Sequence, residues 1–481
     1  MGRPSIAIVG AGPAGIAMAM RLRRAGFTDF TLFERASAIG GVWHHNRYPG
    51  AGCDVPSHLY SFSFAPNPDW RHKFARQPEI ERYLQRCVDD GELASHLRLG
   101  TEVNGARFSP DGGWHLATSS GEHRADILVS GTGQLNRPRI PTLPGLSDFA
   151  RPSFHSAQWD PTFSPAGKRI VVIGNGASAA QFVPELVRDA AHVTVLQRSP
   201  SYVIARNDRA YRALEKWLFR YLPGWRQFYR ALIYWSLEAR FTALHQGSLM
   251  SKLVQWMAMR HLRKQIADAS LRERLTPDYP IGCKRIIISD DWYPALARDN
   301  VSVVTAPIER VTADAVITAD GATHAADALI FATGFDSTSF LAPMQIVGKD
   351  GTTLADAWHG GAEAHRGIAV AGFPNLFLLY GPNTNLGHNS ILFMIECQVR
   401  YILRCLDELG RRGARWLEVK REAMARFNAE LQEALAKTSW GAGCSSWYKT
   451  VEGKITNNWS SRTASYWLCT RKPDFDEFEL G

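Results

Sequence analysis

Two glycine-rich loops, 164 positions apart, constrain what this chain can fold into. One occupies residues 10–15 (GAGPAG) and the other residues 174–179 (GNGASA). Each follows a short apolar run and precedes a stretch of helical character, the context in which such a loop indicates a Rossmann unit. The first glycine permits a tight turn, the second lets a pyrophosphate approach the backbone, and the third small residue lets helix and strand pack closely. The chain is therefore predicted to be an α/β protein with two Rossmann-like dinucleotide-binding domains.

The residue that ends the second strand of each unit distinguishes the two expected cofactors. Glu34 lies 24 positions after Gly10, and the same offset from Gly174 reaches Arg198. An acid at this place holds ribose hydroxyls, whereas an arginine accommodates a 2′-phosphate. The first unit is therefore predicted to hold FAD and the second NADPH, with an unpaired surface arginine as the alternative for Arg198.

The length of 481 residues predicts two or three domains. Residues 1–142 and 330–481 are assigned to the FAD-binding domain, residues 143–204 and 276–329 to the NADPH-binding domain, and residues 205–275 to a helical insertion in the latter. No apolar run is long enough to span a membrane, and no signal peptide precedes the strand-like run at Ser5. Seven cysteines without a CxxC pair predict a reducing cytoplasm and no disulfide framework, and they argue against a dithiol reductase. No metal site is expected.

Positive charge is concentrated in the predicted helical insertion. Residues 205–275 contain 14 Lys/Arg and 5 Asp/Glu, a difference of +9 that equals the net charge of the whole chain. Nucleic-acid binding is therefore a poor inference from the basic composition. Apolar residues recur at helical spacing here, so the tryptophans are predicted to be core residues of helices that shape the substrate entrance: Trp217, Trp225, Trp235 and Trp256. No stable membrane association is expected, because no lipidation motif is present; a membrane-surface or channel-lining role is the alternative.

Three further segments have a composition suited to a cofactor site. Residues 39–54 hold glycines, Trp43 and a proline turn, so they can wrap a flat ring, and Asp54 is their only carboxylate. In isolation, Asp54 would be interpreted as a turn cap. Residues 281–285 end in the adjacent cations Lys284 and Arg285. Residues 149–160 are rich in proline, aromatic and turn residues, so they are predicted to connect the two units without a helix or strand of their own.

These segments together resemble the type I Baeyer–Villiger monooxygenases, which are class B flavoprotein monooxygenases. Residues 40–54 match the family pattern GG-x-W-x4-YPG-x3-D at every fixed position. Residues 149–160 match its fingerprint except at Arg151, where the family has glycine. Glycine there suggests a tight or positive-φ turn, so an arginine requires an altered loop. The resemblance covers nearly the whole chain, and the region from Ile281 onward looks most like the hydroxyacetophenone monooxygenase branch.

The resemblance implies roles for individual residues. Arg285 is the expected catalytic cation, with Asp54 as its ion-pair partner, and Trp447 in a tail loop at 444–448 is expected to close over NADPH. His155 is expected to fix the connector's geometry, with a functional role left open. The expected FAD-binding residues are Gly10, Gly12, Ala14, Gly15, Glu34, Val42, Trp43, Asp54, Tyr60, Val103 and Met394. The expected NADPH-binding residues are Gly174, Asn175, Gly176, Ala177, Ser178, Ala179, Arg198, Ser199, Lys284, Arg285 and Trp447.

The resemblance also implies an activity. NADPH reduces FAD, O2 adds to give a C4a-peroxyflavin, and one oxygen is inserted next to a ketone carbonyl to give an ester or lactone; sulfides are a further expected substrate class. The expected assembly is a monomer or homodimer. One alternative is an amine- or sulfide-oxygenating flavin monooxygenase, whose fingerprint ends in Tyr or Phe where this chain has Trp159. The other is a flavoprotein that consumes NADPH and makes only hydrogen peroxide, as an oxidase or redox sensor.

Overall fold

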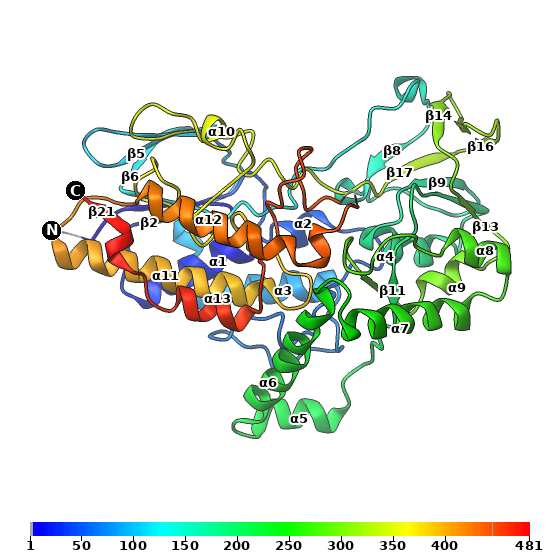
Figure 1. Ribbon diagram of the computed structural model, residues 1–481, viewed down its shortest axis with the longest axis horizontal. Coiled ribbons are helices and arrows are strands. Elements are labelled where there is room, and N and C mark those ends of the chain that lie inside the picture. Colours follow the sequence, from blue (N-terminus) through cyan, green and yellow to red (C-terminus); the bar gives the residue numbers. More distant parts are fainter. Residues whose placement is uncertain (1–2, 445) are drawn as a thin grey trace.

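A computed structural model describes residues 3–444 and 446–481 (Figure 1). Its first sheet is parallel and has the strand order β19-β7-β1-β2-β3. The strands are β1 (Ile6–Val9), β2 (Phe30–Phe33), β3 (Leu97–Arg98), β7 (Ile127–Ser130) and β19 (Leu376–Leu378). Every residue of β1 and β7 is buried, as expected for parallel strands covered on both faces.

Helix α1 (Pro13–Arg24) packs against this sheet and begins inside the first glycine loop. Gly12 is its N-cap, and Pro13 opens the first turn, where a missing N–H and a fixed φ suit a helix start. The helix thus starts within the glycine loop and not, as the sequence had suggested, after it, so its N-terminus lies in the loop itself. The long helix α11 (Ile391–Arg412) packs beside α1, and α13 (Thr463–Thr470) packs on α11. Helices α3 (Gln77–Asp90) and α12 (Arg421–Ala436) complete this domain.

The second sheet is also parallel, with the order β13-β10-β9-β17-β8. Its strands are β8 (Ser153–His155), β9 (Arg169–Ile173), β10 (His192–Leu196), β13 (Val301–Val304) and β17 (Ala328–Phe331). Helix α4 (Ala177–Leu186) follows the second glycine loop and packs against α9 (Trp292–Leu296). The prediction of two Rossmann-like domains is confirmed.

Two sequence-based expectations about the second domain are wrong. Residues 149–160 are not free of regular structure, because they contain β8 and the 3-10 turn Ser156–Gln158. β8 pairs with β17, a partner far along the chain that local composition could not reveal. Because β17 (Ala328–Phe331) pairs with β8 and β9, the whole strand belongs to the second sheet. The domain boundary that the sequence placed between residues 329 and 330 therefore comes after Phe331. Arg151 lies two residues before β8, is exposed and does not have a positive φ, which fits the altered loop expected where the family has glycine.

The remaining strands form small sheets. One is β18-β4-β5-β6, from β18 (Gln345–Val347), β4 (Val103–Phe108), β5 (Trp114–Thr118) and β6 (Gly121–Ala125). Another is β14 (Ile308–Val311), β15 (Ala315–Thr318) and β16 (Thr323–Ala325). β20 (Leu417–Val419) pairs with β21 (Phe478–Leu480), and β11 (Val203–Ile204) with β12 (Ile287–Ile288). Short helices α2 (Val42–His45) and α10 (Leu354–Ala357) lie in loops.

The helical segment of residues 205–275 leaves the second domain after β11 and returns at β12. It contains α5 (Ala213–Tyr221), α6 (Trp225–Glu238), α7 (Leu249–Gln265) and α8 (Ala269–Arg274), and α5 and α6 lie at the lower edge of Figure 1. Trp217, Trp235 and Trp256 are 54%, 61% and 54% exposed, so the prediction that they are core residues is wrong. Helical spacing aligns side chains on one face, but it does not decide whether another element covers that face. No helix in the described part of the chain is long and apolar enough to cross a membrane.

Candidate functional site

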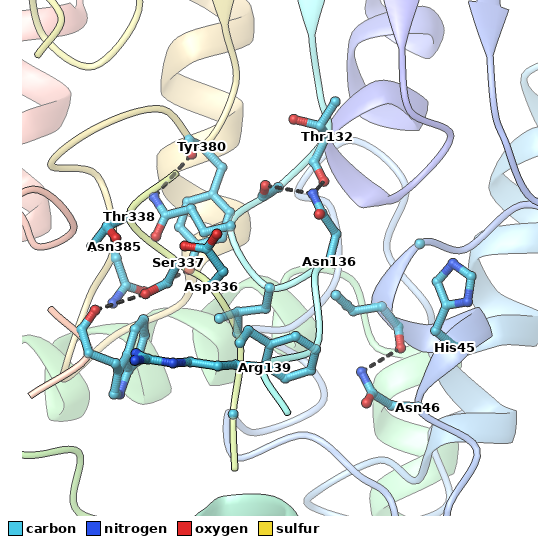
Figure 2. A pocket seen from close by; sticks show the side chains of 18 of the residues that line it. His45, Asn46, Thr132, Asn136, Arg139, Asp336, Ser337, Thr338, Tyr380 and Asn385 are labelled. Carbon is cyan, nitrogen blue, oxygen red and sulfur yellow. Dashed lines mark hydrogen bonds between the residues drawn. The ribbon is translucent and has the colours of Figure 1, made fainter. Parts of the chain in front are cut away.

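A cavity of about 2180 Å³ is lined by both glycine loops, and it lies at the carboxyl ends of the central strands of both sheets. Ligands bind at this edge in open α/β sheets. The loops after β7 and β17 both reach it, with Thr132 and Asn136 on one and Asp336 and Ser337 on the other (Figure 2). Asn136 donates to the Thr132 carbonyl at 2.8 Å, which holds the first of these loops in shape.

The first glycine loop forms a close-fitting cradle with residues 39–54. Gly10 has φ +100°, and a Cβ there would lie 2.8 Å from the Gly131 carbonyl. A Cβ on Gly41 would lie 3.0 Å from the Gly12 Cα, so only glycines allow these backbone segments to approach one another so closely. Glu34 is buried and its Oε2 accepts from the Ala11 amide at 2.8 Å, which fixes the carboxylate at the cavity wall. This geometry fits a pyrophosphate beside the loop and ribose hydroxyls at Glu34.

Two cations, Arg198 and Lys284, line the same cavity as the second glycine loop. Lys284 Nζ donates to Ser199 Oγ at 2.6 Å, and Arg198 lines the same part of the cavity. Burial, together with the positive charge of Arg198, lowers the pKa of Lys284. Asp278 offsets the repulsion between these two cations only in part, so they suit a bound anion, and the offset from the glycine loop places Arg198 where a 2′-phosphate belongs.

Asp54 lies between two arginines. Its Oδ2 is 4.0 Å from Arg285 Nη2, and its Oδ1 is 3.6 Å from Arg206 Nη2. Arg206 is 8% exposed and also donates to the Cys53 carbonyl at 2.5 Å, whereas Arg285 is 40% exposed and lines the cavity. Gln181 Nε2, from helix α4 of the second domain, donates to Asp54 Oδ1 at 3.4 Å. The carboxylate is thus held from three sides, and Arg285 is the cation that remains available to a ligand.

Comparison with known proteins matches this arrangement to one family. Residues 3–347 match the family described as flavin-binding monooxygenase-like. A Baeyer–Villiger monooxygenase of Pseudomonas aeruginosa is 43% identical over 99% of this chain and 91% of its own length. One of Streptomyces coelicolor is 42% identical over 99% of this chain and 92% of its own length. The chain belongs to the Baeyer–Villiger monooxygenases.

Solved structures of related monooxygenases have the same fold as this chain over 99% of its length. The closed crystal structure of cyclohexanone monooxygenase has a TM-score of 0.89 and 27% identity, covering 99% of both chains. The complex of OTEMO with FAD and NADP has a TM-score of 0.89 and 26% identity over the same shares. The parallel sheets around both glycine loops are therefore those of a flavin- and nicotinamide-dependent fold, as the sequence predicted.

Tyrosines complete the surroundings of the arginine. Although the Arg285 side chain is open to the cavity, the protein that encloses the cavity lowers its affinity for a proton; the neighbouring Tyr448, Asp54 and Tyr380 outweigh this and raise its pKa above the usual value. Burial raises the pKa of Tyr448 to about 12 and that of Tyr380 further still, so both phenols stay protonated at neutral pH. Tyr380 donates to Asn385 Oδ1 at 2.7 Å, which fixes the ring beside the cavity (Figure 2).

Most of the predicted cofactor residues line the cavity, with one correction. Val42, Trp43, Tyr60 and Val103 lie in its wall, and Trp43 Nε1 donates to the Tyr60 hydroxyl at 3.0 Å. Gly15 and Ala179 are buried and pack helix against strand, which is the role predicted for the third position of the loop. Met394 is fully buried in the core of the tail and does not line the cavity; α11 reaches it instead through Ile391, Leu392 and Ile395.

The connector links the two domains through aromatic contacts. Trp159 lies with its ring centroid 5.4 Å from Phe182 of α4 and 6.5 Å from Tyr48 of the loop at 39–54. His155 is fully buried, and its Nδ1 accepts from the Ala157 amide at 3.1 Å. Burial lowers the pKa of His155, so it is neutral. This geometry fits a residue that holds the turn in shape.

The tail loop reaches the cavity and is tied down at two points. Trp447 lines the cavity, and its carbonyl accepts from Ser337 Oγ at 2.8 Å. A disulfide joins Cys444 to Cys283, whose neighbours are Lys284 and Arg285. The expectation of a chain without disulfides is therefore wrong, because cysteine count and spacing do not show that two distant thiols meet in the fold. Ser445, also in this loop, lies outside the described residues.

Sequence reasoning missed two residues of the site. Arg206 looked like one more cation of the basic segment, and Gln181 like an ordinary position of a predicted helix. Both contact Asp54 only because the second domain packs on the loop at 39–54. No local pattern marks either residue.

Proposed function

We propose that this monooxygenase binds FAD and NADPH and uses O2 to insert one oxygen next to the carbonyl of a small-molecule ketone, giving an ester or lactone. The observation that carries the proposal is the Arg285 guanidinium. It lines the cavity that both glycine loops share, and Asp54 lies 4.0 Å away. A charged group rich in donors is what an oxygen insertion needs where negative charge develops.

The residues present fit both cofactors. The glycine cradle and Glu34 would hold the pyrophosphate and ribose of FAD, and the lowered pKa of Lys284 beside Arg198 is the mark of a site that a phosphate would neutralise. When bound and reduced by NADPH, the flavin supplies activated oxygen. Trp43 and Tyr60, joined by their hydrogen bond, would form part of the wall beside its ring.

The protein's own part in the reaction is electrostatic and geometric. Arg285 would stabilise negative charge on the attacking oxygen and then on the former carbonyl oxygen of the ketone. Asp54 would keep the guanidinium oriented without neutralising it, because the same carboxylate is shared with Arg206. Tyr380 and Tyr448, with their raised pKa values, would donate hydrogen bonds without losing protons. A closed tail loop would exclude water and limit the loss of hydrogen peroxide.

The decisive experiment is a panel of linear, cyclic and aromatic ketones with NADPH and O2, read by product mass. A neutral product that has gained one oxygen as an ester or lactone supports the proposal. Oxidation of sulfides or amines without any ester would favour the other class of flavin monooxygenase. NADPH consumption that yields only hydrogen peroxide would favour an oxidase or sensor. Sulfide oxidation alongside esters is proposed as a second activity.

Finer assignments belong to the same proposal. The chain would work in the cytoplasm as a monomer or homodimer. If the resemblance of the region from Ile281 onward to the hydroxyacetophenone branch extends to substrates, aryl ketones would be among them. Ester formation from aryl ketones in the panel, together with the mass of the particle in solution, tests these points.

A further inference from the structure

Helices α5, α6 and α7, which lie away from the cavity, each carry a stripe of exposed apolar side chains. Their side chains are 47–86% exposed and comprise Leu214, Trp217, Tyr221, Phe228, Leu232, Trp235, Leu249, Leu253, Trp256 and Met257. Within each helix these residues recur three or four positions apart, so they lie on one side of it. Rows of this kind differ from the single exposed apolar residues that any protein surface shows. We call them the α5–α7 face.

The α5–α7 face is separate from the sides of these helices that pack into the protein core. Each helix also has a buried side, through Phe219 in α5, Ile233 and Leu237 in α6, and Ala258 and Leu262 in α7. Phe219 and Leu262 each belong to the core of one of the two nucleotide-binding domains. None of the residues 205–275, all of which the structure describes, lines the cofactor cavity. The exposed stripes therefore serve neither the core nor the substrate entrance that the sequence predicted for them.

The charge of this segment selects the kind of partner. Between Arg212 and Gln265 there are ten Lys/Arg and two Asp/Glu. Both acids are committed, since Glu215 binds Arg209 at 2.7 Å and Glu238 is buried. Two acids from outside the segment form ion pairs with its arginines, Asp69 with Arg220 and Glu396 with Arg230. Exposed Lys252, Arg263 and Lys264 have no acid on α7 to offset them.

Aromatic and basic side chains are also combined within the face. The Arg260 guanidinium lies 5.4 Å from the centre of the Trp256 ring, so a cation stands directly over an exposed aromatic. Helices with Trp, Phe and Leu among Lys and Arg are suited to the boundary between lipid head groups and acyl chains. A second copy of the chain would oppose one basic surface to another, which like-charge repulsion disfavours.

We propose that the α5–α7 face attaches the protein reversibly to the surface of an anionic phospholipid bilayer. The apolar stripes enter the head-group boundary and the surrounding cations contact lipid phosphates, with no helix crossing the membrane. The expectation of no stable membrane association rested on the core-like spacing of the tryptophans and on the absence of a lipidation motif. The first of these grounds fails, because Trp217, Trp235 and Trp256 are exposed. The attachment is independent of the reaction, so it stands or falls separately from the proposed function.

The test is co-sedimentation of the full chain with phosphatidylcholine vesicles that contain or lack phosphatidylserine. Binding is expected only with the anionic lipid, and it should weaken as salt rises toward ~0.15 M, because surface charges are screened. Trp217→Ser/Trp235→Ser/Trp256→Ser and, separately, Lys252→Glu/Arg263→Glu/Lys264→Glu should each bind at least about tenfold more weakly. Exposed Leu468→Ser and Lys472→Glu, which lie outside the face, are the matched controls and should bind like wild type.

Three results would overturn the proposal. One is no binding to anionic vesicles at low salt. Another is equal binding by the tryptophan variant and the wild type. The third is a wild-type dimer that the tryptophan variant converts to monomer while vesicles bind neither, which would assign the face to a second copy. Circular dichroism and unchanged FAD content of each variant exclude unfolding as the cause of lost binding.

Discussion

At the scale of single residues, Asp54 and its two arginines form the part of the site on which the proposed chemistry depends. Arg206 is buried and fixed, and Arg285 is open to the cavity. An arginine cannot lose its charge at neutral pH, so the difference between the two lies in access and not in protonation. This division predicts different effects when each is replaced.

Arg285→Ala should keep bound FAD but form no measurable ester. The loss of one donor to a developing oxyanion costs about 10²–10³ in rate, and a whole guanidinium should cost at least that. Arg285→Lys, which keeps the charge but loses the fork of donors, should retain part of the activity. Stopped-flow absorbance of the flavin together with product yield measures both steps, and ester formed at near wild-type rate by Arg285→Ala would contradict the assignment.

Arg206→Met should lower the rate of ester formation by about tenfold while the KM for ketone changes little, because Arg206 positions Asp54 and does not line the cavity. The free energy of unfolding should fall by less than the ~3–5 kcal/mol of an isolated buried charge, since Arg285 and Gln181 still face the carboxylate. Arg206→Lys should restore part of both quantities. Steady-state kinetics and urea unfolding test this, and an unchanged rate would make Arg206 purely structural.

Affinity for NADPH should fall as pH rises, and the fall should begin at a lower pH than it would with a lysine of ordinary pKa. Burial and Arg198 lower the pKa of Lys284 in the free protein, and only the protonated amine attracts a phosphate. The positive charge of Lys284 is therefore complete at neutral pH and is lost as pH rises through that lowered pKa, below the usual lysine value. Lys284→Arg should remove this loss of affinity at alkaline pH.

Arg198→Ala should raise the KM for NADPH at least tenfold, about 1.4 kcal/mol, with little change for NADH. Equal loss with both nucleotides would argue against a 2′-phosphate site.

At the scale of structural elements, the tail loop and the segment at 281–285 act as one unit. The disulfide joins them next to Lys284 and Arg285, and the Ser337 hydroxyl holds the Trp447 carbonyl. A covalent tie between two loops limits how far either can move from the cavity. The closure expected of Trp447 over NADPH should therefore depend on this cross-link.

Cys444→Ser should leave FAD bound but raise the fraction of NADPH that ends as hydrogen peroxide several-fold, because the untied loop closes less often. Cys469→Ser removes a free, partly buried thiol in α13, outside the loop, and is the matched control. Trp447→Ala should uncouple the reaction in the same direction. The ratio of ester to NADPH consumed measures the effect, and wild-type coupling in Cys444→Ser would show that the cross-link does not serve closure.

At the scale of the whole molecule, two domains meet through the loop at 39–54. Tyr48 and Gly52 in that loop each bond to Gln181 of α4, at 3.1 and 3.2 Å, and Trp159 packs between Tyr48 and Phe182. A movement of one domain relative to the other would therefore change the contacts of the connector.

Trp159→Ala should disturb the alignment of the two cofactor sites without emptying either of them. We expect normal FAD content, a modestly raised KM for NADPH and ester formation lowered by about tenfold, since a small misplacement of reacting groups is costly. Trp159→Phe should lose less, because it keeps an aromatic ring against Phe182. Rapid-mixing measurement of flavin reduction separates the domain effect from later steps, and wild-type kinetics in Trp159→Ala would show that the connector does not couple the domains.

The sequence by itself determined what is encoded in contiguous residues. Strand, glycine loop, helix and terminal Glu34 or Arg198 occur together within about thirty residues, so both nucleotide sites could be predicted from local steric and charge requirements. The pattern at 40–54 likewise predicted the loop that carries Trp43 and Asp54. Tertiary structure alone decided the rest, because it depends on contacts between segments far apart in the chain: β8 pairing with β17, Cys283 meeting Cys444, Arg206 reaching Asp54, and the rotation of α11 that turns Met394 away from the cavity. The same applies to the exposed tryptophans, since helical spacing creates an apolar stripe, but only the packed molecule shows that nothing in the described chain covers it.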